Sequence, residues 1–449
     1  MLAQTIIDLL IPDSGSGKAM LAAVLLGASC GLLGCFVVLR RVALMGDAIS
    51  HAVLPGVVAG MVYSADRNPL VIFLCAAVAG LIGAGLVRAL SSTTRLKPDT
   101  ALGIILATFF ALGIVWHSRN QSDTAGVMNF LFGSMGEIDS NDLTMMMAVT
   151  LLLTLMIYFL KRPLLVMSFD EGFSRGLGYP VKVLNAVFYF MLTFSVVVAL
   201  QAVGVVLVSA MLITPAAAAY LLTDRFGKML VLSVTLGIVS GVVGALVSIF
   251  YNKMPTGPVI TLAATAVFAV MYFTAPRHGV LSKILRASKR RRRVKRENTL
   301  KAIYQILEGE GFQREDVDFI DLAHKRRVTE DVVRKECTAL LKYEFIEIAE
   351  EKRSLRLTKP GWKRAMEMVR NHRLWELYLT NEADYAEDHV HEDAEKIEHI
   401  LGANIVRQLE LDLDFPELDP HGKPIPQPLI QPSIVPVDSA SESSATVPA

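Results

Sequence analysis

Histidine and acidic residues are spaced at helical intervals in the last third of the chain, where they could bind a metal ion. His372 and Glu376 are four residues apart, so a helix would place both on one face. The segment HVHEDAEKIEH places four further donors on one face of a second helix: His391, Glu395, Glu398 and His399. Imidazole and carboxylate groups together suit Mn²⁺, Fe²⁺ or Zn²⁺. The simpler alternative is a solvated helix face rich in histidine and glutamate.

A second carboxylate–imidazole pair lies in an apolar part of the chain. Asp47 and His51, in the segment LMGDAISHAVLPGV, are again four residues apart. Ionisable groups within a membrane span are costly and usually face a polar cavity or pathway. The pair therefore indicates a polar cavity or pathway within the membrane, and its chemistry suits a transition metal such as Mn, Fe or Zn. The alternative is a pair near the membrane surface that stabilises a helix end.

Composition indicates which elements must carry these groups. The 449 residues are 53% hydrophobic, which is too high for an ordinary soluble protein. The net charge of +1 conceals an asymmetry, because charges are sparse up to Pro276 and dense afterwards. The basic run KRRRRVKR at 289–296 marks the join between a membrane half and a soluble half. The four cysteines form no CxxC pair, which argues against a disulfide framework or a zinc site of that type.

Apolar runs predict eight or nine membrane-spanning helices, and nine fits the charge pattern better. About 20 apolar residues cross a bilayer core. Lys and Arg gather at alternate ends of the runs, which places the N-terminus outside and the C-terminal half in the cytoplasm. Small residues at this spacing let helices approach closely. They are Gly27, Gly31 and Gly34 in the first span, and Gly237, Gly241 and Gly244 near the end.

Two further segments of the membrane half carry signals. Residues 168–181, SFDEGFSRGLGYPV, are too polar to span a membrane. They predict a short amphipathic helix on the cytoplasmic side, with a plain loop as the alternative. Residues 205–221 carry Pro215 in mid-span, followed by four alanines, and a proline there can kink or break a helix.

The membrane half resembles the ABC-3 family of permeases over roughly residues 15–280, in the strings GDAISHAVLPG, FDEGFSRGLGYP and LITPAAAA. Members of this family are membrane subunits of bacterial ABC importers for manganese, zinc and iron, so the resemblance implies a protein of the bacterial inner membrane. The resemblance implies that Asp47 and His51 line the metal pathway. It also implies that a short segment couples the permease to an ATPase, through Asp170, Glu171, Gly172, Gly176 and Gly178.

The resemblance also implies partners. No Walker A loop occurs in the sequence, so the chain is expected to be a transport subunit rather than an enzyme and to rely on a separate ATPase subunit. The other implied partners are an extracytoplasmic metal-binding protein and a second copy of the permease or a related permease.

The soluble half has the pattern of a winged helix-turn-helix followed by a long helix. Helices are expected at 298–309, 315–325, 330–343 and 359–379, and short strands at 345–348 and 355–357. The tail from Pro416 is rich in proline and serine and is expected to be disordered. The expected domains are a permease at 1–280, a basic linker at 281–296, a winged helix-turn-helix at 297–365, a helical metal-binding and dimerisation domain at 366–415, and the tail at 416–449.

The soluble half resembles the iron- and manganese-dependent repressors, the diphtheria-toxin-repressor family, over about residues 297–426. The strings that carry the resemblance are NHRLWELYL, VHEDAEKIEHIL and DPHGKPIP. The resemblance implies a divalent metal cofactor in two sites. It assigns as ligands His372, Glu376, His391, Glu395, Glu398 and His399. The acid at Glu395 slightly favours Mn²⁺ over Fe²⁺. Asn298 and Lys301 stand where the manganese-type members have carboxylates, and a lysine opposes metal binding.

Nucleic-acid binding is a weaker expectation. The recognition helix begins Thr329-Glu330-Asp331, and its acids would repel phosphates. Neighbouring basic residues partly compensate, so the expected DNA contacts are Arg326, Arg327, Thr329, Arg334 and Lys335. The run KRRRRVKR has three interpretations: an anchor on anionic lipid, which is favoured, a non-specific DNA-binding arm, or a flexible protease-sensitive linker.

The expected fold is mostly α-helical, with a polytopic membrane domain of eight or nine spans followed by a winged helix-turn-helix and a helical metal-binding and dimerisation domain. The expected function is the permease subunit of an ABC importer for divalent metal ions, with Mn²⁺ favoured, fused to a cytoplasmic metal-sensing domain. The alternative is a membrane-anchored, metal-dependent transcriptional regulator whose membrane half does not transport. Import of cobalamin or chelated iron ranks lower, because a wide apolar pathway needs no Asp–His pair.

Overall fold

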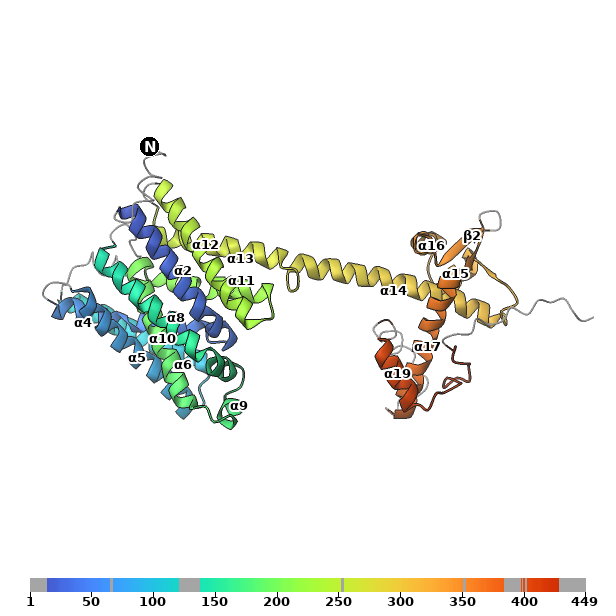
Figure 1. Cartoon of the computed structure of the whole chain (residues 1–449), viewed down its shortest axis with the longest axis horizontal. Coiled ribbons are helices and arrows are strands. Elements are labelled where there is room, and N and C mark those ends of the chain that lie inside the picture. The colour runs from blue at the N-terminus through green and yellow to red at the C-terminus, as the bar shows by residue number, and fades with distance from the viewer. Residues whose placement is uncertain are drawn as a thin grey trace, which may run out of the picture. The chain divides into compact units, whose positions relative to one another are not determined.

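The computed structural model is mostly helical and divides into two compact units, Met1–Ile284 and Leu285–Ala449. It describes residues 14–64, 68–120, 138–251, 254–349, 353–382, 397, 399 and 402–427. Each unit has a hydrophobic core of its own, and Figure 1 shows the helices and strands that build each one.

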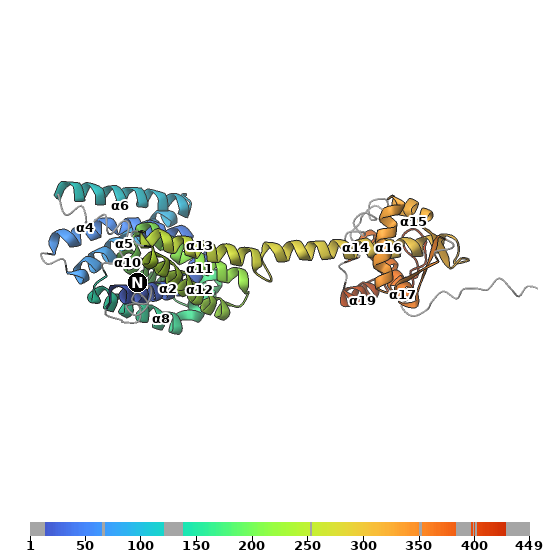
Figure 2. The same ribbon diagram turned by 90° about the horizontal axis from the view of Figure 1, so that it is seen from above.

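The first unit is a helical bundle. Its helices are α2 (Gly15–Leu39), α3 (Ala43–Ala52), α4 (Leu54–Tyr63), α5 (Pro69–Thr93), α6 (Pro98–Asn120), α8 (Ser140–Phe169), α9 (Glu171–Gly176), α10 (Val181–Val203), α11 (Val205–Leu222), α12 (Phe226–Phe250) and α13 (Thr256–Thr274). Within the described ranges, eight helical segments are long and apolar enough to cross a membrane, with α3 and α4 counted together, and α11 is a shorter apolar helix. The expectation of eight or nine spans is confirmed. Figure 2 shows α6 along one edge of the unit, beside α4 and α5.

Glycines bring α2 and α12 into backbone contact, as their spacing predicts. A methyl group on Gly27 would lie 2.5 Å from the backbone of Gly237, and one on Gly237 would lie 2.4 Å from the carbonyl oxygen of Gly27. One turn away, the buried Ser233 hydroxyl donates a hydrogen bond of 2.7 Å to the Gly31 carbonyl oxygen. Gly34 makes a similar approach to the backbone of Leu212 in α11. α2 and α12 therefore pack through their main chains rather than through side chains.

Helix breaks follow local chemistry. The apolar stretch that holds α10 and α11 divides at Gly204, whose φ of +78° favours glycine. The segment around Asp47 is two helices that meet at Val53, and Pro55 in the first turn of α4 has no N–H to continue the hydrogen-bond ladder. Pro215 lies inside α11, which continues through it.

The second unit contains a winged helix-turn-helix and a helical extension. Its elements are α14 (Val280–Gly309), which begins just before the boundary, β1 (Asp316–Asp318), α15 (Phe319–Arg326), α16 (Glu330–Lys342), β2 (Ile346–Ala349), β3 (Ser354–Leu357), α17 (Lys359–Glu382) and α19 (Ala403–Asp412). The strands form an antiparallel sheet in the order β1-β3-β2, with Val317 opposite Leu355 and Ile348 opposite Leu355 on the other side.

The predicted two-stranded wing was incomplete. Residues 316–318, expected to open a helix, pair with β3 as a third strand, and the helix begins at Phe319. The reason lies in the burial pattern, because Val317 is buried while both neighbours are exposed, and alternation of this kind belongs to a strand.

Two segments at expected domain boundaries have structure of their own. The basic segment 281–296 lies within α14 and is helical. Residues 416–427, assigned to the disordered tail, instead form a turn with a bridge between Leu418 and Pro424 and a buried Ile425. Arg373 and Arg370 of α17 hold this turn in place, because they donate hydrogen bonds to the carbonyl oxygens of Pro424 and Pro426.

Replacing Gly237 by leucine is expected to separate α2 from α12, because no side chain fits between the two backbones. Overpacking of this kind typically costs about 1–3 kcal/mol. The variant should show a lower unfolding temperature in detergent and a smaller monodisperse peak in size-exclusion chromatography. Gly103→Leu is the matched control, since a methyl group on this helical glycine meets nothing within 4 Å. Equal stability of the two variants would contradict the packing argument.

Candidate functional sites

Asp47 and His51 lie on one face of α3, as expected. His51 Nε2 is 3.9 Å from Asp47 Oδ1, and the two side chains are 24% and 39% exposed, the histidine being the more buried. The His51 ring packs edge-on against Phe110 of α6, with ring centroids 5.2 Å apart. His51 Nδ1 is buried and has no hydrogen-bond partner among the described residues. One carboxylate and one imidazole at this separation can ligate the same divalent ion after a small rearrangement.

Small residues of the same segment position this pair. A methyl group on Gly46 would lie 2.8 Å from the Leu212 side chain in α11, and one on Gly56 would lie 2.3 Å from the Cys75 carbonyl oxygen in α5. The glycines therefore let α3 and α4 pack closely against two neighbouring helices. The string GDAISHAVLPG thus combines two ionisable groups with the contacts that hold their helix.

The short helix expected in 168–181 is present as α9. Asp170 is its N-cap, and Asp170 Oδ1 accepts backbone hydrogen bonds from Gly172 (2.7 Å) and Phe173 (3.0 Å). Gly178, with φ of +82°, turns the chain away after the helix, whereas Gly176 has open space around it. Asp170 therefore fixes the start of α9, and Gly178 fixes the turn after it.

Glu171 ties α9 to two other helices. Glu171 Oε1 accepts hydrogen bonds from Asn185 Nδ2 in α10 (3.1 Å) and from the Arg40 guanidinium at the end of α2 (3.4 Å). The Arg40 guanidinium also donates to Asn185 Oδ1 and lies 4.4 Å from the centre of the Phe188 ring. Glu171 therefore links α9 to α2 and α10 through a charged contact in which the Arg40 guanidinium is buried and Glu171 is partly exposed.

Sequence reasoning missed the apolar side chains around α9. Phe169, Phe173 and Leu177 are 72%, 61% and 53% exposed. Phe169 is the last residue of α8, Phe173 lies in α9 and Leu177 follows it, so the three side chains lie along this short segment rather than on one helix face. Large apolar residues at three positions of a polar segment were a readable signal. Exposed apolar residues grouped in this way indicate a surface that another protein covers.

The soluble unit brings together some of the predicted metal ligands. His372 Nε2 lies 3.1 Å from Glu376 Oε1, and both side chains are buried. His391, Glu395 and Glu398 lie outside the described residues. His399 Nδ1 is 2.8 Å from Glu297 Oε2, and this partner was not among the predicted site residues.

Glu297 is a buried acid surrounded by cations. It accepts hydrogen bonds from Arg293 (2.9 Å) and from Arg364, besides its contact with His399. Burial alone would raise the pKa of Glu297, but hydrogen bonds from His399, Arg364 and Arg293 outweigh it and lower the pKa to about 2. The carboxylate is therefore charged and engaged at neutral pH.

Among the residues that the structure describes, the surroundings of Asn298 and Lys301 are a poor site for a divalent ion. Lys301 is 6% exposed and lies one helical turn after Asn298, whose Oδ1 is buried with no hydrogen-bond partner in the described ranges. A buried ammonium and an amide stand in place of the two carboxylates that the repressor family has there, and the neighbouring carboxylate of Glu297 is already held by two arginines. Buried like charges repel a metal cation.

A different group of donors is assembled nearby. Glu376, Asp419 and His421 have ligand atoms that all lie within 4.8 Å of one another, and this is the one such group of three found among the residues that the structure describes. Asp419 and His421 belong to the turn that was assigned to the disordered tail. The string DPHGKPIP, which contains both, was the signal that could have identified them.

Two of the expected DNA contacts are occupied within the protein. Arg326 pairs with Glu336 at 3.4 Å, and Arg334 pairs with Glu330 at 2.6 Å. Arg334 also lies over the Phe319 ring. Arg327 ends α15 in the left-handed region, Thr329 is the N-cap of α16 without a side-chain cap hydrogen bond, and Lys335 is exposed. These pairs reduce the positive charge that the helix offers to phosphate.

Comparison with known proteins gives two family matches. Residues 16–275 match the ABC 3 transport family, and residues 358–427 match the iron dependent repressor, metal binding and dimerisation domain. The second match ends at residue 427 and so includes Asp419 and His421.

Individual relatives cover the membrane unit and, in one case, more. The chain is 34% identical over 367 residues to the manganese transport system membrane protein MntC of Bacillus subtilis, covering 81% of this chain and 83% of that protein. This alignment is longer than the first unit, so it extends into the second. The chain is 34% identical over 289 residues to the zinc transport system membrane protein TroC of Treponema pallidum, covering 64% of this chain and 96% of that protein.

A solved structure has the same membrane fold. PsaBC from Streptococcus pneumoniae, determined in complex with Fab, superposes with a TM-score of 0.58 and 34% sequence identity. The match covers 64% of this chain and 100% of that chain.

Acidification is expected to destabilise the second unit through Glu297. Because its folded-state pKa of about 2 lies below the ordinary value of 4.5, its stabilisation is fully present above pH 4.5 and is lost as the pH falls towards 2. Glu297→Gln should lower the unfolding free energy at pH 7 by on the order of 2 kcal/mol and flatten this acid dependence. Guanidinium unfolding followed by tryptophan fluorescence measures both. Glu347→Gln, an exposed carboxylate paired with Arg356, is the control and should change neither.

Proposed function

The chain belongs to the ABC 3 transport family, and from that premise we propose that it imports Mn²⁺ as the membrane permease subunit of an ABC transporter. Its relatives are permeases for divalent transition metals, so the permease hypothesis fits better than a membrane-anchored regulator that does not transport. The observation that carries the proposal is the Asp47–His51 pair on α3, inside a bundle of apolar helices.

Manganese is the proposed cargo among several possible ions. The relative that extends over most of this chain is a manganese transport protein, whereas TroC is named for zinc. A carboxylate with an imidazole suits Mn²⁺ but does not exclude Fe²⁺ or Zn²⁺. In this proposal Asp47 and His51 replace water ligands of the hydrated ion as the ion passes.

A separate ATPase subunit supplies the energy in this proposal. It docks on α9 and the residues on either side of it, where Phe169, Phe173 and Leu177 are large, apolar and exposed. Its movement on ATP binding reaches α2 and α10 through the contacts of Glu171 with Arg40 and Asn185. An extracytoplasmic metal-binding protein delivers the ion, and a second permease copy or a related permease completes the membrane part. The N-terminus lies outside, and α9 and the second unit lie in the cytoplasm.

The second unit senses cytoplasmic metal in this proposal. The match to a metal-binding and dimerisation domain supports metal binding, and its fusion to a permease suits feedback on transport. Operator DNA is a secondary proposal, because Arg326 and Arg334 are paired with acids of α16.

Asp47→Ala and His51→Ala are each expected to reduce uptake of radioactive Mn²⁺ at least tenfold in cells that express normal amounts of the protein. The loss follows because each substitution removes one of the two ligands on α3. His278→Ala, an exposed histidine paired with Asp224 outside this pair, is the control. Undiminished uptake in both variants would reject the pathway assignment and favour the regulator.

Phe173→Asp is expected to weaken binding of the ATPase subunit at least tenfold, because a charge replaces the middle one of the three apolar residues around α9. Co-purification and the affinity of the reconstituted pair measure this effect. Tyr251→Asp, an equally exposed aromatic residue after the far end of α12, is the control. If both variants bind the ATPase as wild type does, α9 is not the docking surface.

A further inference from the structure

We propose that the first unit binds a phosphate-bearing anion in a cavity beside α9. The cavity has a volume of about 320 Å³ and is lined by Arg40, the C-cap of α2, and by residues of α3, α5, α6, α8, α9 and α10. This volume lies at the lower end of the range for small-ligand sites. Binding of the anion does not depend on transport, and only its consequence for α9 rests on the proposed coupling role.

The cavity is lined by arginines and by residues with hydroxyl groups. Arg40 and Arg88 supply guanidinium groups, and Ser91, Ser168 and Tyr189 supply hydroxyls. The two serine hydroxyls donate to carbonyl oxygens of their own helices, whereas the Tyr189 hydroxyl makes no hydrogen bond to another described residue. A guanidinium presents its N–H donors in a fork that matches phosphate, and phosphate offers several acceptor oxygens to donors from different directions. The lining therefore favours an oxyanion over a cation or a neutral ligand.

Arg40 is almost completely buried, and its hydrogen bonds are incomplete. The side chain is 9% exposed, and its Nη2 donates to Glu171 and Asn185. Nη1 is buried and has no hydrogen-bond partner among the described residues. A buried cationic donor without an acceptor is costly. An anion in the cavity would stabilise the charge of Arg40, in surroundings whose low dielectric strengthens the attraction.

Arg88 adds a second charge that the described part of the chain does not neutralise. It is half-buried in the last turns of α5 and makes no ion pair with any residue that the structure describes. Among the described residues that line the cavity, Glu171 is the one acid, and it is shared between Arg40 and Arg175. Two arginines of the cavity therefore face one carboxylate, which leaves a positive charge for a ligand to compensate.

A second cavity gives room for the group to which a phosphate is attached. It has a volume of about 680 Å³ and shares Arg40, Ser168 and Phe169 with the first, while Arg41 and Tyr220 are among its other lining residues. Inorganic phosphate needs the first cavity alone, whereas the headgroup of an anionic phospholipid can extend towards the second. Both sources carry the phosphate chemistry that the arginines recognise.

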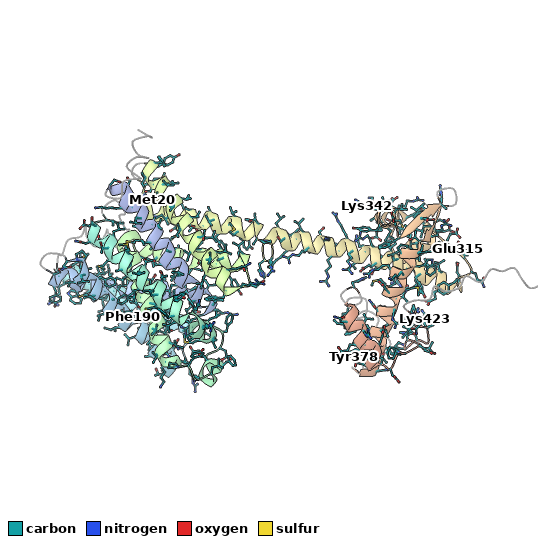
Figure 3. The ribbon with its side chains drawn as sticks, in the orientation of Figure 1. Met20, Phe190, Glu315, Lys342, Tyr378 and Lys423 are labelled. Atoms are coloured by element: carbon teal, nitrogen blue, oxygen red, sulfur yellow. The ribbon has the colours of Figure 1, made fainter. Side chains whose placement is uncertain are left out.

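The site lies where α9 is attached to the bundle. In Figure 1, α9 lies at one end of the first unit, beside α8 and α10, and Figure 3 labels Phe190 on α10, the residue after Tyr189. Glu171 of α9 pairs with Arg40, which also lines the cavity. A bound phosphate therefore competes with Glu171 for the same guanidinium, so that occupancy of the cavity and the position of α9 are linked.

Binding of phosphatidylglycerol and of inorganic phosphate to the full chain tests the site. The protein is kept in a neutral detergent, bound lipid molecules are counted by native mass spectrometry, and bound phosphate is measured by equilibrium dialysis. Arg88→Gln is expected to raise the dissociation constant for one bound phosphatidylglycerol or phosphate at least tenfold, and Tyr189→Phe at least threefold. Arg119→Gln, an exposed arginine at the other end of α6, is the matched control and should bind as wild type does.

The basic segment 281–296 attracts anionic lipid in every variant, so the difference between variants reports the cavity. An unchanged unfolding temperature of Arg88→Gln without added anion shows that the fold is intact, and Tyr189→Phe, which removes only a hydroxyl, serves if it is not. Weakened binding of phosphatidylglycerol alone assigns the site to a lipid headgroup, and weakened binding of inorganic phosphate assigns it to free phosphate.

Equal binding of both anions by wild type, Arg88→Gln and Tyr189→Phe overturns the site, and so does the absence of binding to wild type. If Arg88→Gln leaves both anions bound and instead weakens the ATPase subunit, the cavity belongs to a protein interface and the site is overturned as well. The dialysis and the mass measurement contain no transport step, so a failure of the transport proposal leaves their outcome unchanged.

Discussion

Arg40 ends α2 with its guanidinium almost out of water, and a charge in that position must meet an opposite charge or a hydrogen-bond acceptor. Glu171 and Asn185 meet it, and in doing so they fix α9 to the ends of two long helices. The position of α9 depends on this contact, because a six-residue helix has too few internal hydrogen bonds to hold its own position. The exposed apolar side chains around α9 are thus positioned by a polar contact that they do not themselves make.

The same requirement governs the buried acids of the second unit. Around Glu297 the protein supplies two arginines, Arg293 and Arg364, together with the imidazole of His399, so the acid is already compensated. Around Asp419 the balance is different, because Arg373 is shared with Glu308. Two buried acids that look alike in the sequence therefore differ in local charge.

Sequence patterns predicted those features that depend on neighbours along the chain. The spans, the glycine faces, α9 and the three helices of the winged domain all follow from periodicity within about 25 residues. Features that depend on distant contacts were missed. Glu297 is separated by 102 residues from His399, and Arg373 by 51 residues from Pro424, so no local pattern links them. Strand β1 was not predicted for the same reason, because residues 316–318 form a strand only by pairing with β3.

The contact between α2 and α12 joins residues that are 202 positions apart, Gly31 and Ser233. A ribosome adds roughly 5–20 residues per second, so α2 waits roughly 10–40 s before its partner is made. During that interval its glycine face has no matching backbone to cover it. A chain that terminates before α12 keeps this face exposed permanently, which distinguishes an incomplete product from a finished one. Membrane proteases that recognise poorly packed helices would therefore remove truncated chains of this protein and spare complete ones.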